Sequence, residues 1–181
     1  KNAINLEKAS KEISEITSNI IYVAADLSTE SGCQSVIDAT INKFESIDIL
    51  INNVGAANEE DVLTLKRSTV VNATSLKTFS YLSMAQLAIP HMQKKHWGRI
   101  INIAGGAGTS PNANNLPLSF ANAAVLNMTR ALSNQVSRDN ILVNVICPGV
   151  TNTDRARELI KGRINSEDTN LEDAIQALGK S

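Results

Sequence analysis

The chain has 181 residues, of which 43% are hydrophobic and 19% charged, and its formal net charge is −1. It is long enough to bury a sizeable core, while the balanced charge and the 3% of aromatic residues argue against nucleic acid or an anionic membrane as a partner. No apolar run approaches the roughly 20 residues of a membrane-spanning helix, so we expect a soluble protein of the cytoplasm.

The first quarter of the chain predicts a helix, a strand, a second helix and a second strand. Apolar residues at helical spacing alternate there with short β-branched runs. The predicted elements are a helix over Leu6–Ile16, a strand over Ile20–Ala25, a helix that begins after Ser28 or Thr29 and reaches Phe44, and a strand over Ile47–Ile51.

The remainder of the chain continues the alternation. Its predicted elements are a long helix over Ser68–Lys95, a strand over Arg99–Ala104, a loop over Gly105–Pro117, a helix over Ser119–Ser137, a strand over Ile141–Ile146, and helices over Asp154–Arg163 and Leu171–Leu178. Pro90 is expected to kink the long helix or to end its regular part. Asn140, which tolerates left-handed backbone angles, is expected to form the turn into the last of these strands.

Near-continuous apolar strands separated by helices indicate a parallel sheet covered on both faces. The chain shows no internal repeat, low-complexity tract or convincing linker. We therefore expect residues 1–181 to form a single α/β domain with a doubly wound parallel sheet.

Five segments carry a resemblance to a known family. They are Asp26-Leu27, Asn52-Asn53-Val54-Gly55, Asn72, Gly98–Ile103 and Pro148–Thr153. In this order and at this spacing they resemble the motifs of short-chain dehydrogenases/reductases, and together they cover nearly the whole chain. The resemblance implies a Rossmann-like fold, NAD or NADP as the cofactor, a small carbonyl or alcohol substrate, and a homodimer or homotetramer.

The resemblance also assigns roles to residues. Asp26 and Leu27 would contact the adenine ring, Asn72 would belong to a proton relay, and Pro148–Thr153 would close over the nicotinamide. The cofactor-binding residues implied are Asp26, Leu27, Asn53, Val54, Gly55, Asn122, Pro148, Gly149, Val150 and Thr153. The role of Gly55 has a physical basis, because a glycine after a parallel strand lets the backbone approach a nucleotide closely. The alternative is that the asparagines only form turns or occupy ordinary polar positions.

The catalytic residues that the family uses are missing. Alignment on Asn102-Ile103 and on Ala123–Asn127 places the family's serine, tyrosine and lysine at Gly105, Leu118 and Asn122. Leucine carries no exchangeable proton and asparagine no charge, so the family's mechanism cannot run with these side chains. Loss of general acid help alone typically costs ~10²–10⁴ in rate. Asn122 still has an amide that can bond a ribose hydroxyl.

Other side chains near these positions give no obvious replacement. Thr109, Ser110 and Ser119 are poor proton donors without an activating base. Gly105–Gly108 precedes a long loop rather than a helix, so it reads as a flexible turn and not as a phosphate loop. The cysteines and histidines are too scattered for a metal site and lie at Cys33, Cys147, His91 and His96.

Three functions stay open: an oxidoreductase with altered chemistry, a non-catalytic nucleotide-binding protein, and an oligomeric scaffold. A scaffold would pair the helices Ser68–Lys95 and Ser119–Ser137 with their copies, whereas the alternative is that their apolar residues face their own sheet. Those residues are Leu76, Phe79, Leu82, Phe120, Val125, Met128 and Leu132.

The family also has strands before Lys1 and a last strand after Ser181. We therefore expect the sheet to be incomplete at both ends, with the sequence forming part of a longer polypeptide. In the family's strand order, two further strands separate the strand at Ile20 from the one at Ile47. NAD and NADP both stay open, because the family reads the ribose in that first part.

Overall fold

The computed structural model describes residues 3–55, 60–111, 113, 115–149, 151 and 153. The chain divides into two compact units, Lys1–Ile146 and Cys147–Ser181. All helices and strands of the described residues belong to the first unit. The helices predicted at Asp154–Arg163 and Leu171–Leu178 lie outside the described residues.

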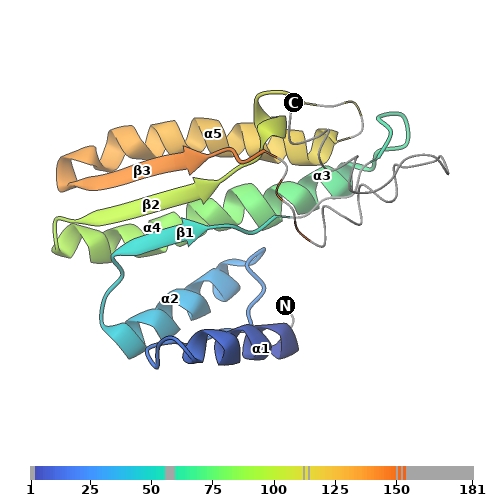
Figure 1. Cartoon of the computed structure of the whole chain (residues 1–181). Helices are drawn as coiled ribbons and strands as arrows, with labels where there is room; N and C mark the ends of the chain where they lie inside the picture. The colour runs from blue at the N-terminus through green and yellow to red at the C-terminus, as the bar shows by residue number, and fades with distance from the viewer. Residues whose placement is uncertain are drawn as a thin grey trace. The chain divides into compact units, whose positions relative to one another are not determined.

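Three parallel strands form the sheet. They are β1 (Ile49–Asn52), β2 (Gly98–Ile103) and β3 (Ile141–Ile146), in the order β1-β2-β3. Leu50 pairs with Ile100, and Ile100 pairs with Val143, so one row of buried side chains crosses the sheet. All three strands point the same way, and their carboxyl ends form one edge of the sheet (Figure 1). The predicted parallel sheet is confirmed for these strands.

Five α-helices accompany the sheet in the described part of the chain. They are α1 (Ala3–Ser14), α2 (Glu30–Phe44), α3 (Arg67–Thr74), α4 (Ser80–Lys94) and α5 (Leu116–Val136). A π-helical turn, η1 (Ser75–Phe79), joins α3 to α4, so the predicted long helix is present as one helical run. The expectation that Pro90 ends the regular part is wrong, because α4 continues through it to Lys94. A proline removes a single N–H from the helical ladder, and only the last turn follows Pro90.

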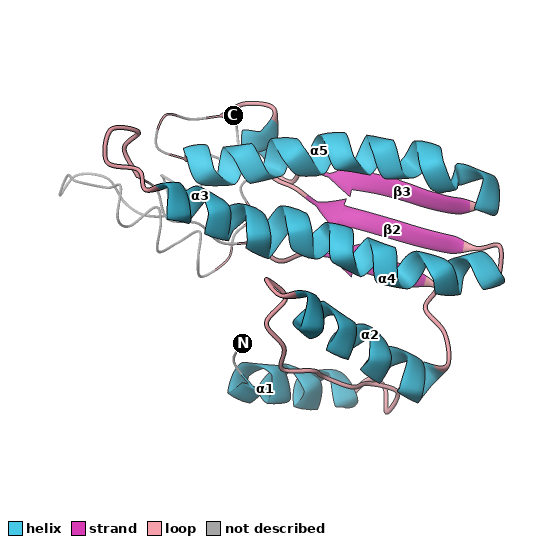
Figure 2. Ribbon diagram, turned by 180° about the vertical axis from the view of Figure 1, so that it is seen from behind, coloured by secondary structure: helices cyan, strands magenta, loops and turns pink. Residues whose placement is uncertain are grey.

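The helical run of α3, η1 and α4 lies beside α5, and both cover the same face of the sheet (Figure 2). The hydroxyl of Thr78 in η1 donates to the carbonyl of Ala121 in α5 at 3.1 Å. α2 packs against α4 through a buried cluster that includes Cys33, Ile37, Met84, Ala85 and Ala88. The opposite face of the sheet exposes apolar side chains of the outer strands, namely Ile49, Ile51, Leu142 and Ile146.

The prediction of a strand over Ile20–Ala25 is wrong. These residues have no regular secondary structure, and the sheet of the described residues begins at β1. An apolar run becomes a strand only when a neighbouring strand supplies its ladder of hydrogen bonds. The segment instead leads into α2, to which Leu27 adds a partly buried apolar side chain.

Local signals at two element ends are confirmed. Thr29 is the N-cap of α2, and its hydroxyl accepts the backbone N–H of Gly32 at 3.1 Å. Asn140 has φ 57° and ψ 31°, the left-handed conformation expected at the turn into β3. Across the described residues, none of the helices is both long enough and apolar enough to cross a membrane.

Candidate active site at the carboxyl ends of the strands

A buried polar network lies beneath the carboxyl edge of the sheet. The side-chain amide of Asn52 donates to Oδ1 of Asn102 at 2.9 Å, and Nδ2 of Asn102 donates to the hydroxyl of Thr129 at 2.9 Å. Thr129 in turn donates to the carbonyl of Val125 within α5 at 2.7 Å. The network ties the ends of β1 and β2 to α5. It therefore fixes the positions of the loops that leave these strands.

The segment Asn53-Val54-Gly55 leaves β1 at this edge. Asn53 and Gly55 are exposed, while Val54 is half-buried. The carbonyl of Val54 accepts a hydrogen bond from the hydroxyl of Tyr81 at 2.9 Å. Asn53 and Gly55 are therefore accessible to a ligand, whereas Val54 is held in place by its hydrogen bond with Tyr81.

Tyr81 lies at the centre of this edge but is not placed to act as an acid. It is fully buried, and its hydroxyl contacts the carbonyls of Val54 and Ile103 at 2.9 and 3.0 Å. Burial raises the pKa of Tyr81 far above its usual range, and the hydrogen bond to Val54 opposes this only in part. A buried phenol that bonds two backbone carbonyls holds the two strand ends together.

Gly105 and Asn122, which the alignment places at the family's serine and lysine, lie close together. A Cβ on Gly105 would lie 3.0 Å from Nδ2 of Asn122, and a Cβ on Gly108 would lie 3.0 Å from the Cβ of Asn122. The turn over Gly106–Gly108 (η2) thus packs directly on α5. Leu118 is half-buried in the first turns of α5.

Asn122 is covered in this arrangement. Its side chain is 2% exposed, and its Oδ1 is buried without a hydrogen-bond partner among the described residues. A buried acceptor that lacks a donor costs free energy, so a donor that reaches it would be favoured. The hydroxyl of Ser119, one turn earlier in α5, is also buried without a hydrogen-bond partner among the described residues.

Asp26 and Leu27 lie in the turn before α2. Oδ1 of Asp26 accepts hydrogen bonds from the backbone N–H of Ser28 at 3.1 Å and from its hydroxyl at 2.7 Å. A Cβ on Gly32 would lie 2.0 Å from the carbonyl oxygen of Asp26, so α2 approaches this turn as closely as glycine allows. The turn is therefore closely packed against α2, and Ser28 orients its acidic side chain.

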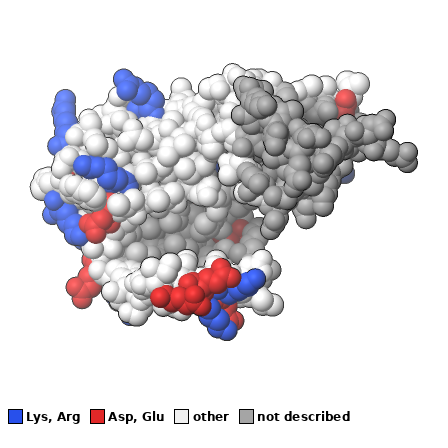
Figure 3. All heavy atoms as spheres, in the orientation of Figure 1, with Lys and Arg blue, Asp and Glu red and all other residues white. Residues whose placement is uncertain are grey.

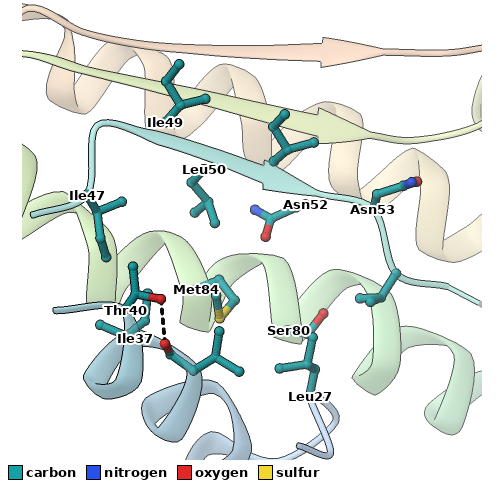
Figure 4. Close-up of a pocket in the computed structure, with 13 residues that line it drawn as sticks. Leu27, Ile37, Thr40, Ile47, Ile49, Leu50, Asn52, Asn53, Ser80 and Met84 are labelled. Carbon is teal, nitrogen blue, oxygen red and sulfur yellow. Dashed lines mark hydrogen bonds between the residues drawn. The ribbon is translucent and has the colours of Figure 1, made fainter. Parts of the chain in front are cut away.

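Leu27 and Asn53 line the same cavity, although they are far apart in the sequence. This cavity has a volume of about 280 Å³ and lies between α2, β1 and α4 (Figure 4). Its walls are mainly apolar and include Ile37, Leu50 and Met84. In Figure 4, Leu50 points towards α4 whereas Ile49 points the other way, as the alternation of a strand requires. Leu27, one of the two predicted adenine contacts, therefore borders an apolar slot beside β1.

The remaining predicted residues are Asn72 and four residues of the segment Pro148–Thr153. Asn72 lies on α3 with its side chain exposed. Pro148, Gly149 and Thr153 belong to the unit Cys147–Ser181, and Val150 lies outside the described residues.

Sequence reasoning missed Lys77, a residue of η1. Its ammonium donates to the carbonyl of Ile103, the last residue of β2, at 2.9 Å. A lysine inside a helical stretch normally reads as a solvated position, but this one is 7% exposed. The available signal was its spacing from Tyr81 and Ser80, since all three residues point towards the sheet from one stripe of the helix.

On the face of the molecule in Figure 3, many of the charged side chains cluster in two places. Figure 3 shows them over α1 and around the end of the sheet where the strands begin. Lys95 and Asp48 form an ion pair of 2.7 Å at that end.

Comparison with known proteins identifies the family. The family model for short chain dehydrogenases matches residues 1–163. The chain is 29% identical over 165 residues to the NADPH-dependent reductase BacG of Bacillus subtilis (strain 168), covering 89% of this chain and 63% of that protein. It is 31% identical over 169 residues to the (2S)-[(R)-hydroxy(phenyl)methyl]succinyl-CoA dehydrogenase subunit BbsD of Thauera aromatica, covering 87% and 64%.

Solved structures agree on the fold. YwfH, an NADPH dependent reductase involved in bacilysin biosynthesis, superposes with a TM-score of 0.89 at 26% identity, over 98% of this chain and 70% of that one. L-sorbose reductase from Gluconobacter frateurii, solved with NADPH and L-sorbose, gives a TM-score of 0.91 at 23% identity, over 98% and 68%. The chain spans roughly three fifths of the length of the curated relatives it matches, 63% and 56% for two of them. The Rossmann-like fold is confirmed.

Proposed function

The chain belongs to the short-chain dehydrogenase/reductase family, and we propose that it binds NAD or NADP and acts as an oxidoreductase without the family's serine, tyrosine and lysine. The observation that carries the proposal is the site itself. At the carboxyl edge of a parallel sheet, where nucleotides bind in open α/β folds, Asn53 and Gly55 are exposed and Leu27 borders an apolar slot. The substrate proposed is a small carbonyl compound or the corresponding alcohol.

The residues present fit a dinucleotide in two places. An apolar cavity of about 280 Å³ beside Leu27 and Asn53 suits a flat aromatic base. Near Gly105, the buried Oδ1 of Asn122 lacks a donor among the described residues, and a ribose hydroxyl could supply one if the covering turn moved. When bound, the nicotinamide would supply or accept the hydride.

The side chains of the chain would bind and orient the cofactor rather than move a proton through a phenol. Asp26 is oriented by Ser28 and would accept from the adenine amino group. Asn53, Val54 and Gly55 would present backbone groups at the end of β1. Asn72 and the segment Pro148–Thr153 keep their proposed roles in a relay and in covering the nicotinamide.

The chemistry proposed is slow by the family's standard. Leu118 offers no proton at the position of the tyrosine, and Tyr81 is buried with its hydroxyl on two carbonyls. Protonation of the substrate oxygen would then fall to water or to another donor. Without a positioned acid, the expected rate lies ~10²–10⁴ below that of a complete site.

Hydride transfer can be tested directly with NADH and NADPH deuterated at C4 of the nicotinamide. Each is incubated with the protein and a panel of ketones and aldehydes, and the alcohol products are analysed by mass spectrometry. Deuterium in a product, absent from incubations without protein, supports the oxidoreductase. Cofactor binding without deuterium transfer to any compound would favour the second candidate instead.

That second candidate is a non-catalytic nucleotide-binding or scaffold protein. The observation that favours it is the pair Phe79 and Phe120, which are 55% and 56% exposed on neighbouring helices. Val125 and Leu132 are buried against the molecule's own core, so only part of the predicted interface is available. A homodimer or homotetramer in the cytoplasm is proposed for either candidate. Light scattering after size-exclusion chromatography tests it, and a monomer would contradict it.

A further inference from the structure

Lys77 occupies an irregular turn at the carboxyl edge. It lies in η1, the π-helical turn between α3 and α4, where one extra residue is fitted into the helix. Such turns occur frequently at functional sites. The Lys77 side chain is only 7% exposed, although lysine is almost never fully buried without partners.

The surroundings of Lys77 fix its ammonium at the ends of two strands. Nζ donates to the carbonyl of Ile103 at 2.9 Å and lies 5.5 Å from the centre of the Tyr81 ring. A Cβ on Gly55 would lie 3.1 Å from Cδ and 3.2 Å from Nζ of Lys77. The charge is therefore held between the loop that leaves β1 and the last residue of β2.

The same region lacks the charge that the family places on α5. Asn122 stands at that position and is neutral. Its amide approaches Gly105, two residues after Ile103 on the same strand end. A hydrogen bond links η1 to α5 there, because the hydroxyl of Thr78, the neighbour of Lys77, donates to the carbonyl of Ala121.

We propose that Lys77 supplies the positive charge of the nicotinamide half of the cofactor site, from the helix before β2 instead of from α5. The inference rests on the proposed function. A charge at the strand ends stabilises electron-rich ribose and phosphate oxygens over several ångströms, because the Lys77 side chain is largely shielded from water. Lys77 is a binding residue in this account, and its effect does not depend on the residue at position 118.

The geometry separates the two halves of the ligand. Leu27, one of the two predicted adenine contacts, lines the cavity between α2, β1 and α4, and Asp26 precedes it in the turn before α2. The Lys77 ammonium bonds instead to β2, which lies on the other side of β1 from that cavity. Removal of the charge should therefore weaken binding of the nicotinamide half and spare the adenosine half.

The experiment titrates the full chain with NADPH, NADH and ADP by calorimetry, with ADP probing the adenosine half. Lys77→Met removes the charge, Lys77→Arg keeps it, and Lys94→Met is the matched control on the exposed end of α4. Loss of one charged contact predicts an affinity for the dinucleotides about tenfold lower in Lys77→Met. Lys77→Arg should recover most of the affinity, and ADP should bind all variants alike.

Circular dichroism confirms that each variant is folded, and Lys77→Gln replaces Lys77→Met if the methionine variant is not. Unchanged dinucleotide affinity in the neutral variant would overturn the inference and leave the proposed function standing. Equal losses for NADPH and ADP would also overturn it, since they indicate a structural role. If folded wild-type protein binds no dinucleotide, the proposed function fails and the inference fails with it.

Discussion

The side chains of Asn52 and Asn102 meet across the ends of β1 and β2, with Nδ2 of Asn52 2.9 Å from Oδ1 of Asn102. Both are buried, and the second bond of Asn102 extends the contact to Thr129 in α5. A buried amide is stable only when its donors and acceptors are satisfied, so this pair specifies the register of the strand ends. The predicted site residues follow directly after Asn52 and soon after Asn102.

Asn102→Ala should destabilise the protein by about 2–4 kcal/mol, because it leaves Asn52 and Thr129 without their partner. Urea unfolding followed by circular dichroism measures the change. Asn144→Ala, on the neighbouring strand β3 with an exposed side chain, should change the free energy of unfolding by less than about 0.5 kcal/mol. Similar effects of the two substitutions would contradict a structural role for the pair.

Gly32→Ala should destabilise the protein even though alanine is favoured over glycine in a helix by about 1 kcal/mol. The added Cβ would lie 2.0 Å from the carbonyl oxygen of Asp26, so the turn that carries Asp26 and Leu27 must move. The expected net loss is about 1–3 kcal/mol. Gly106→Ala is the control, because no atom lies within 4 Å of its added Cβ. A more stable Gly32→Ala variant would show that this close approach is absent.

Leu118→Tyr combined with Gly105→Ser and Asn122→Lys restores the family's catalytic side chains. If the site is intact apart from these positions, NADPH-dependent reduction of a carbonyl should rise by about 10²-fold or more. The matched control carries Leu118→Phe with the other two substitutions, which supplies the ring without the hydroxyl. Equal turnover of the two triple variants would mean that residue 118 does not face the reacting atoms.

The stability of the protein should fall at alkaline pH through Tyr81. Burial raises the pKa of Tyr81 in the folded state, so unfolding releases its proton once the pH exceeds the ordinary tyrosine value of about 10. The stabilising contribution is therefore complete below that pH and is lost above it, at up to about 1.4 kcal/mol per pH unit.

Urea unfolding at pH 8, 10 and 11 measures this dependence. Tyr81→Phe should be less stable than the wild type at pH 8, because two backbone carbonyls lose their donor. It should also show a shallower decline between pH 10 and 11. Parallel pH profiles for the two proteins would contradict a buried, protonated Tyr81.

Local signals in the sequence predicted much of this fold. Thr29 marks the start of α2 and Asn140 the turn into β3, because each role depends on one residue and its immediate neighbours. The run Ile20–Ala25 was misread, since strand formation depends on a partner that lies elsewhere in the sequence. Apolar composition alone cannot report whether that partner is adjacent.

The site was harder to predict than the fold. The resemblance located the strand-end segments around Asn53 and Gly105, because short motifs identify backbone positions. It did not reveal Lys77, because the role proposed for this residue depends on the contact of its side chain with Ile103, which lies far away in the sequence. It also could not show that a turn of glycines packs on Asn122 and covers it.

Binding of a nicotinamide dinucleotide tests the central claim most directly. Calorimetric titration of the folded chain with NADH and with NADPH should give saturable binding of at least one of them at a single site per chain. Such a result would support a family site that still holds its cofactor after losing the serine, tyrosine and lysine. Absence of binding by both cofactors, in protein that circular dichroism shows to be folded, would contradict the account and leave a scaffold with Rossmann architecture.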